Sequence, residues 1–362
     1  MGDFDKWDRA FREQNLYAFN NDRSGLLWLK VRSVCRAKLL DMFLEESGIR
    51  LESRKMSEQF EELFGLLGMR ESSMGVVDKF LRERAHEWYV VGGVDERKLR
   101  NDLYKVRQYE WGGGYTNSLD KHFVSHYVKE ISDHDVLESR RQEIALNAWR
   151  YVETSWYNNW TSYLLESIFK RHRRVVPAVG EIKSVDFFIE GFPIDLKVTN
   201  LPSQYMGEEF KARCGVSELV WLKSEAKRRG IVLDGDVAQS DQLYILQERL
   251  ASAGHGDAIE AFRGIRSEIV EDATKDNRQL LKWLYTNQGE TRFGAENRIF
   301  IILADLKDMS ESWKMKRAFD KIEPFVNGYL DDFDGETLRK VRFRYGAKVY
   351  HALADTIFVI RD

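Results

Sequence analysis

Two acidic residues and a lysine lie close together in the middle of the chain. Eight residues separate Asp186 from the segment Asp195-Leu196-Lys197. Side chains of a strand alternate between its two faces, so Asp195 and Lys197 are expected side by side on one face. Gly191 marks a turn between two strand-like segments. A hairpin at this turn would bring Asp186 beside the Asp195/Lys197 pair.

Two carboxylates and an amine in one place suit a hard divalent cation and phosphodiester hydrolysis. Mg²⁺ takes oxygen ligands, often only one or two carboxylates, and completes its shell with water and substrate phosphate oxygens. Hydrolysis requires an activated water, a neutralised phosphate and a stabilised leaving oxygen, and a metal ion supplies all of these. Lys197 would contact the attacking water or the phosphate. A solvated strand face with an Asp–Lys ion pair is the alternative explanation.

The periodicity of the sequence predicts the elements that position these residues. Residues 185–190 and 192–199 alternate like paired strands, and residues 174–177 form a short β-like segment before them. A long helical stretch is predicted over 136–171. Residues 297–304 have the continuous apolar run of a strand buried on both faces.

Helices are predicted over much of the remaining chain. A buried helix is expected over 24–46, and the other candidate elements are helices at 56–67, 74–88, 208–285 (with two breaks) and 310–330, and a last strand at 356–360. This order predicts an α/β (or α+β) core, a mixed sheet of about five strands flanked by helices. Residues 1–145 would form a helical N-terminal region, and residues 146–362 the core, with a helical insertion near 205–285.

The acidic pattern resembles the PD-(D/E)XK nuclease superfamily, which includes many type II restriction endonucleases. That family places an acid at the start of the second core strand and an acid-x-lysine on the third, and Asp186 and Asp195-Leu196-Lys197 match these positions. The proline that usually precedes the first acid is absent, and Val185 stands there. The matched segment runs from about residue 150 to 200.

Families of this fold often add a glutamate on the preceding helix. Glu166 is the best match for it here, and Glu153 is the second. The resemblance implies a Mg²⁺-dependent endonuclease of double-stranded DNA with a restriction-endonuclease-like fold, Mn²⁺ being an alternative ion. The metal ligands would be Asp186, Asp195, Glu166 and the Leu196 carbonyl, and Lys197 would orient water and offset phosphate charge.

Two active sites are the simple way to cut both strands of a duplex, so a symmetric homodimer is expected. The helical N-terminal region would contact DNA, dimerise, or both. Two alternatives stay open. One is a phage-defence, repair or mobile-element nuclease with weak sequence preference. The other is a non-catalytic DNA-binding protein of the same fold.

Composition restricts the remaining possibilities. The net charge of −3 is less basic than is usual for a nucleic-acid binder, but basic clusters occur at 170–174, 227–229, 314–317 and 339–348. Amines such as Lys314 and Lys316 are candidates for phosphate contacts, or for a solvated face. The polar segment 287–294 is a candidate loop on DNA or an ordinary connection.

Several classes of partner and location are not expected. Two cysteines give no zinc spacing, and reduced thiols favour a cytoplasmic protein. The sequence has neither a membrane-spanning apolar stretch nor a phosphate-binding loop, so no membrane partner and no nucleotide cofactor are expected. Aromatic residues crowd 149–163 at helical spacing, which favours core packing over base stacking.

Overall fold

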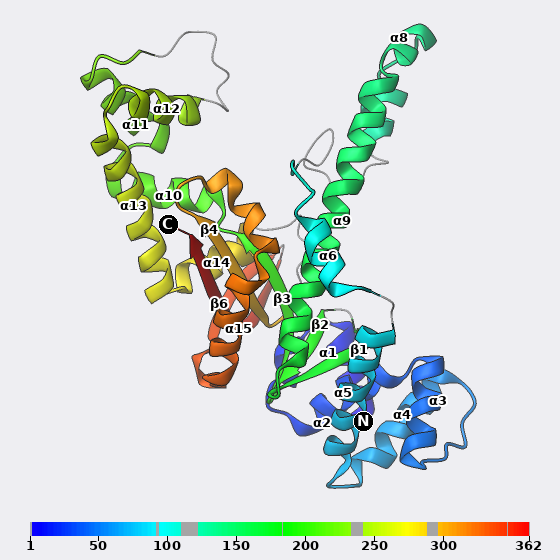
Figure 1. Cartoon of the computed structure of the whole chain (residues 1–362). Coiled ribbons are helices and arrows are strands. Elements are labelled where there is room, and N and C mark those ends of the chain that lie inside the picture. The colour runs from blue at the N-terminus through cyan, green and yellow to red at the C-terminus, as the bar shows by residue number, and fades with distance from the viewer. Residues whose placement is uncertain are drawn as a thin grey trace.

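A six-stranded mixed sheet lies at the centre of the protein (Figure 1). The computed structural model describes residues 2–91, 94–109, 122–182, 184–232, 242–287, 296–345 and 347–361. The strands are β1 (Val175–Ile182), β2 (Val185–Ile189), β3 (Phe192–Asn200), β4 (Arg298–Asp305), β5 (Arg339–Tyr345) and β6 (Lys348–Arg361), in the spatial order β1-β2-β3-β4-β6-β5. Strand β4 runs parallel to β3 and β6, and the other neighbouring pairs are antiparallel. The mixed α/β class predicted from the sequence is therefore confirmed.

The sheet has one strand more than the predicted five or so. The additional strand is β5, which lies in a segment for which the sequence analysis predicts only a basic cluster. Val341 and Phe343 are buried, whereas Arg342 and Arg344 between and beside them are exposed. This alternation is typical of an edge strand that is covered on one face only. Strand β6 is also longer than the predicted segment 356–360.

The N-terminal helices pack on the β1–β2 end of the sheet (Figure 1). They are α1 (Asp3–Arg12), η1 (Leu16–Phe19), α2 (Arg23–Val34), α3 (Ala37–Ser47), α4 (Met56–Gly68) and α5 (Ser73–Val91). Their apolar side chains share a core with Val176, Val185 and Phe188 of the first two strands. The single helix predicted for 24–46 is two helices, because Cys35 and Arg36 leave the helical conformation without a proline or glycine to signal the break.

One face of the sheet is covered by the long helix α9 (Arg141–Arg171) and by α15 (Phe319–Asp331). Between α5 and α9, the described elements are α6 (Glu96–Leu103), η2 (Val124–Val128) and α8 (His134–Ser139). The helix predicted over 136–171 is therefore interrupted at Arg140. The N-terminal half of α9 projects away from the sheet (Figure 1), and Trp149 there is 60% exposed. The core packing predicted for the aromatic residues of 149–163 is therefore wrong for Trp149 but confirmed for Tyr157, which is fully buried.

The other face of the sheet is covered by helices inserted between β3 and β4. The insertion contains α10 (Ser203–Cys214), α11 (Glu218–Arg228), α12 (Gln242–Ser252), α13 (Gly256–Lys275) and α14 (Arg278–Asn287). Helix α14 packs on β5 and β6, whereas α11 and α12 pack on each other farther from the sheet (Figure 1). Two 3₁₀ helices, η3 (Met309–Arg317) and η4 (Gly335–Thr337), flank α15, so the helix predicted for 310–330 begins as η3. Within the described residues, no helix is both long and apolar enough to cross a membrane.

A close approach of the N-terminal region fixes the turn between β2 and β3. Glu190 has a left-handed backbone with φ of 52°. The Gly191 carbonyl accepts a hydrogen bond of 2.8 Å from the N–H of Asn21. A Cβ atom on Gly191 would lie 2.0 Å from the Asn21 side chain, so a larger residue would push the two segments apart.

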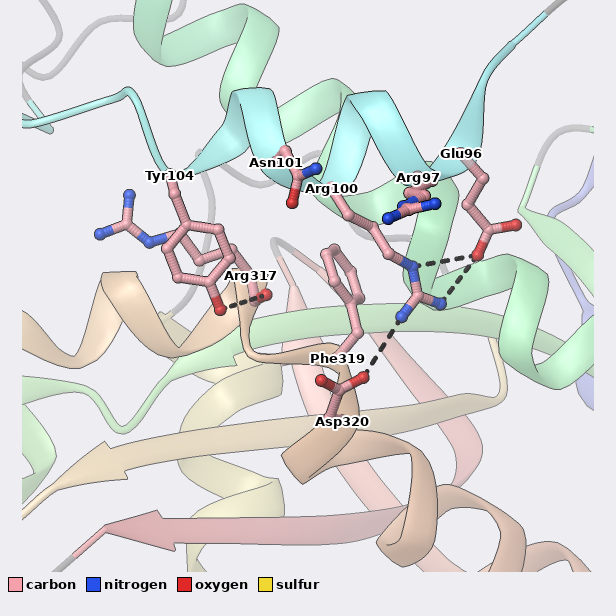
Figure 2. A pocket seen from close by; sticks show the side chains of 8 residues that line it. All are labelled: Glu96, Arg97, Arg100, Asn101, Tyr104, Arg317, Phe319 and Asp320. Carbon is pink, nitrogen blue, oxygen red and sulfur yellow. Dashed lines mark hydrogen bonds and ion pairs between the residues drawn. The ribbon is translucent and has the colours of Figure 1, made fainter.

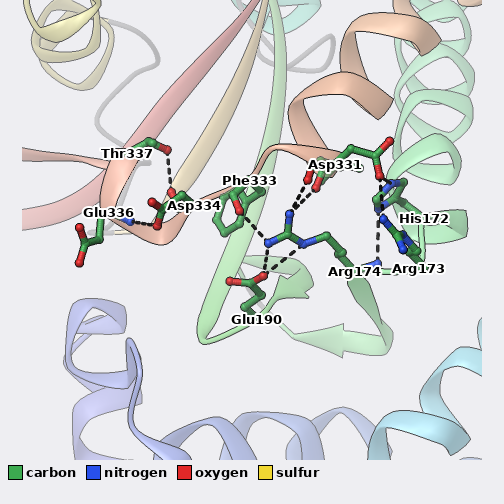
Figure 3. Close-up of polar contacts among 10 residues, drawn as sticks. His172, Arg173, Arg174, Glu190, Asp331, Phe333, Asp334, Glu336 and Thr337 are labelled. Atoms are coloured by element: carbon green, nitrogen blue, oxygen red, sulfur yellow. Dashed lines mark hydrogen bonds and ion pairs between the residues drawn. The ribbon is translucent and has the colours of Figure 1, made fainter.

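Arg174 clamps the same turn to the end of α15 (Figure 3). Its guanidinium forms an ion pair with Glu190 beside the turn. It also donates hydrogen bonds to the carbonyl oxygens of Leu330 (3.1 Å), Asp331 (2.8 Å) and Phe333 (2.7 Å). The planar guanidinium is suited to such multiple contacts. The clamp holds the β2–β3 hairpin in a fixed place on the sheet.

Candidate active site

At Asp195, strand β3 stops pairing with β2 and begins to pair with β4. Residues 192–194 pair antiparallel with β2, and from Asp195 onward the strand pairs in parallel with β4. The last pair on the β2 side joins Ile194 to Phe187. Asp186 and Asp195 are the next residues on the two strands, so they lie where β2 and β3 separate.

Beyond Ile194, the Asp186 carboxylate takes the place of a β2 backbone carbonyl as the hydrogen-bond acceptor for β3. The Leu196 N–H donates to Asp186 Oδ2 at 2.7 Å, whereas the Asp195 N–H donates to the Asn297 carbonyl on the β4 side. The N–H and carbonyl of one strand residue point to the same side, so the Leu196 carbonyl also faces the Asp186 side. The structure thus brings Asp186 to the backbone of the segment Asp195-Leu196-Lys197.

Three carboxylates influence one another at this place. Burial, together with the negative charges of Glu166 and Asp195, raises the pKa of Asp186 to about 7, against the hydrogen bond from Leu196. Like charges that cannot separate favour the neutral form of one of them. Carboxylates gathered in this way are stabilised by a cation.

Helix α9 supplies Glu166. The ring of Phe169, three residues later, stacks on Phe187 of β2 with centroids 5.1 Å apart, and this contact fixes the helix over the strand. Glu153, the second match of the sequence analysis, lies thirteen residues earlier on α9. That spacing corresponds to roughly 20 Å along a helix axis. The structure therefore places Glu166, and not Glu153, near Asp186.

Asp195 has a cationic partner that the sequence analysis did not identify. Arg298 Nε lies 2.7 Å from Asp195 Oδ2, and Arg298 Nη2 lies 2.8 Å from Glu296 Oε2. The parallel register of β3 and β4 pairs Asp195 with Arg298, so both side chains occupy one face. Ser184 Oγ donates to the other Glu296 oxygen at 2.8 Å. An arginine at the start of an apolar strand was the only sequence signal for this network.

Each of the three carboxylates has one engaged oxygen. Asp186 Oδ2 accepts from Leu196, Asp195 Oδ2 from Arg298 and Glu166 Oε2 from Lys170. In the part of the chain that the structure describes, the second oxygen of each makes no hydrogen bond. These oxygens are the donor type that Mg²⁺ prefers.

The donor set fits Mg²⁺ only with ligands beyond carboxylates. Among the described residues, no three His, Cys, Asp or Glu side chains are arranged around a single metal position. Mg²⁺ is commonly held by one or two carboxylates, with water and phosphate oxygens in the other positions. Asp186, Asp195 and the Leu196 carbonyl satisfy this smaller requirement.

A buried lysine lies near Lys197. Lys316 of η3 is 9% exposed and donates to Asn158 Oδ1 of α9 at 2.9 Å. Burial, with the positive charge of Lys197 adding to it, lowers the pKa of Lys316 to about 8. Lys316 forms no ion pair with any described residue. The amine of Lys316 is therefore buried without a carboxylate partner among the described residues. In the sequence, Lys316 is only one of several neighbouring amines.

Comparisons of the chain with protein-family models, curated proteins and solved structures found no match. The function is therefore inferred from the site itself. The polar segment 287–294, predicted as a candidate loop on DNA, lies outside the described residues from position 288 onward.

Proposed function

We propose that this protein is a Mg²⁺-dependent endonuclease that hydrolyses the phosphodiester bonds of double-stranded DNA. The observation that carries the proposal is the Asp186 carboxylate, bound to the Leu196 N–H where β2 and β3 separate. Glu166 and Asp195 lie close enough to raise its pKa. A divalent cation would offset the repulsion among these groups.

The side chains then take complementary roles. Asp186 and Asp195 would hold Mg²⁺ with the Leu196 carbonyl, and Glu166 would assist them. When bound, the ion would polarise the phosphate and lower the pKa of a bound water. Lys197 would orient the attacking water and offset charge on the phosphate.

The connectivity of the sheet supports the resemblance to PD-(D/E)XK nucleases. Helix α9 leads into the antiparallel strands β1, β2 and β3, and β4 returns parallel to β3 after the helical insertion. Asp186 lies at the start of β2, and the acid-x-lysine lies on β3. We therefore propose that the protein has a restriction-endonuclease-like core and is, most specifically, a type II restriction enzyme. We also propose a cytoplasmic location, where its thiols would stay reduced.

Digestion of plasmids of known sequence tests how specific the enzyme is. A type II restriction enzyme should give discrete bands whose number follows the sequence of each plasmid. A continuous smear would instead support the low-specificity nuclease of phage defence, repair or mobile elements. Sedimentation with and without DNA tests the expected homodimer, because two sites are needed to cut both strands at once.

The Arg298–Asp195 ion pair favours a second candidate, a non-catalytic DNA-binding protein of the same fold. Arg298 is 4% exposed and already compensates one of the carboxylates on which the metal would depend. Mg²⁺ titration by calorimetry separates the two candidates. The nuclease should bind Mg²⁺ and lose that binding in Asp186→Asn, whereas the non-catalytic protein should bind DNA equally well with Mg²⁺ and with EDTA.

A further inference from the structure

A pocket that the proposed chemistry does not use opens between α6 and the junction of η3 with α15 (Figure 2). Its volume is about 430 Å³, which is within the range of small-ligand sites. We call it the α6 pocket. Its walls are Glu96, Arg97, Arg100, Asn101 and Tyr104 on one side and Arg317, Phe319 and Asp320 on the other.

Four residues of the α6 segment that line the pocket share one face of the helix. Arg97, Arg100, Asn101 and Tyr104 follow the spacing i, i+3, i+4 and i+7, which places them in a row roughly 10 Å long. Figure 2 shows Arg100, Asn101 and Tyr104 projecting toward the segment that carries Arg317. The row has a cationic end and an aromatic end.

The guanidinium groups at the cationic end have hydrogen-bond donors that an anion could bind. Within the described part of the chain, Arg97 makes neither a hydrogen bond nor an ion pair. Arg100 is held by Glu96 at 2.8 Å, but its Nη1 lies 3.6 Å from Asp320. The Asp320 side chain is 98% exposed, so this longer contact is weak and an incoming anion could replace it.

The aromatic end has a fixed ring with an accessible surface. Tyr104 is 51% exposed, and its hydroxyl donates to the Arg317 carbonyl at 3.2 Å. The Arg317 guanidinium lies 4.8 Å from the centre of the Tyr104 ring and is itself held by the carbonyl oxygens of Leu103 and Val106. Such a ring is a platform on which a nucleic-acid base can stack.

The α6 pocket lies beside the candidate active site. Glu96 on its rim pairs with Arg171 of α9 at 3.2 Å, and the preceding residue, Lys170, pairs with Glu166 at 2.8 Å. Burial raises the pKa of Tyr163, and the charges of Glu96 and Glu166 add to it, so this ring is near both carboxylates. A strand crossing the active site is therefore within reach of the pocket.

We propose that the α6 pocket binds one unpaired nucleotide of a nucleic-acid strand, with the phosphate at Arg97 and Arg100 and the base against Tyr104 and Asn101. This inference rests on the proposed function, because it identifies how the substrate strand is held next to the cutting site. The phosphate contacts would position the strand, and the stacked base has to be free of its partner in a duplex.

Binding of a labelled single-stranded oligonucleotide of about ten nucleotides tests this, measured by fluorescence anisotropy on the full chain in EDTA. Arg97→Ala and Tyr104→Leu should each weaken binding about tenfold, and Tyr104→Phe, which keeps the ring, about twofold or less. Arg97→Ala should also reduce the slope of log affinity against log salt by about one. The matched controls Arg54→Ala and Tyr244→Leu, at exposed positions elsewhere, should bind like the wild type.

Wild-type affinity in both Arg97→Ala and Tyr104→Leu would overturn the inference. So would displacement of the oligonucleotide by free adenosine monophosphate at equal concentration, because the pocket would then hold a free nucleotide. EDTA prevents cutting during the binding measurement. A protein that binds as expected but does not cut with Mg²⁺ would refute the proposed function and leave the pocket in place.

Discussion

Asp186 Oδ2 accepts a hydrogen bond of 2.7 Å from the backbone N–H of Leu196. This contact favours the ionised carboxylate, whereas burial and the charges of Glu166 and Asp195 favour the neutral form and raise its pKa to about 7. Ionisation of Asp186 is therefore unfavourable in the metal-free protein near neutral pH. The cation that would relieve this repulsion is the one that the proposed chemistry requires.

Asp186→Asn should stabilise the metal-free protein and abolish cutting. The amide oxygen can still accept from Leu196, but the charge is gone. A raised folded-state pKa contributes stability that is fully present below the unfolded pKa, near 3.8, and is lost as the pH rises through about 7. The gain of the variant in free energy of unfolding should therefore grow between these pH values, to at most about 4 kcal/mol.

Denaturant unfolding at several pH values, in EDTA, measures this difference. Asp41→Asn is the matched control, because Asp41 is exposed and its change should stay within about 0.5 kcal/mol at every pH. An Asp186→Asn protein that is less stable than the wild type at pH 7 would contradict the account. Added Mg²⁺ should raise the stability of the wild type and leave Asp186→Asn unchanged.

Binding of Mg²⁺ should weaken as the pH falls below about 7. Asp186 has to lose its proton to act as a ligand, and its pKa is raised to about 7. The apparent affinity should fall by up to about tenfold per pH unit on the acid side. Calorimetry in buffers of different ionisation enthalpy should detect proton release near pH 6 and almost none near pH 8. A constant affinity between those values would refute the role of Asp186.

Lys316→Met should leave the fold intact and slow cutting. Lys316 is buried without an ion pair among the described residues, and its pKa is lowered to about 8, so the charged form is unfavourable in the folded protein at pH 7. The variant should be about 1 kcal/mol more stable. Cutting should fall between about tenfold and a hundredfold if the amine offsets phosphate charge. Undiminished cutting by the stabilised variant would assign Lys316 a structural role only.

Arg174→Met should destabilise the protein by about 2–3 kcal/mol, because it leaves carbonyl oxygens at the end of α15 without their donor. Arg173→Met is the matched control: the Arg173 side chain is 80% exposed and its ion pair with Asp331 should contribute less than about 1 kcal/mol. Thermal unfolding of the two variants measures the difference. Equal melting temperatures would show that Arg174 does not clamp the hairpin.

Local sequence patterns predicted much of the fold around the site. The alternation in β2 and β3, the turn at Gly191 and the apolar run of β4 each depend on residues close together in sequence. The helix breaks at Arg36 and Arg140 carry no proline or glycine, and β5 has the composition of a solvated surface. These features depend on tertiary packing, which a single sequence does not display.

The candidate site likewise contains residues that the sequence could predict and residues that it could not. The spacing of Asp186, Asp195 and Lys197 predicted the hairpin residues, and the family resemblance pointed to one helix glutamate, Glu166. The Arg298 partner of Asp195 is 103 residues away in sequence, and no periodicity connects them. Lys316 could not be singled out from its neighbouring amines, because burial alone distinguishes it.

Hydrolysis of supercoiled plasmid DNA by the purified protein in Mg²⁺ tests the central claim most directly. The wild type should cut in Mg²⁺ and not in EDTA. Asp195→Ala and Lys197→Ala should lose at least about a hundredfold in rate while remaining folded. Glu153→Ala should retain wild-type cutting, and Glu166→Ala should not. No Mg²⁺-dependent cutting by the wild type, or equal cutting by Asp195→Ala, would contradict the assignment of this site as a nuclease.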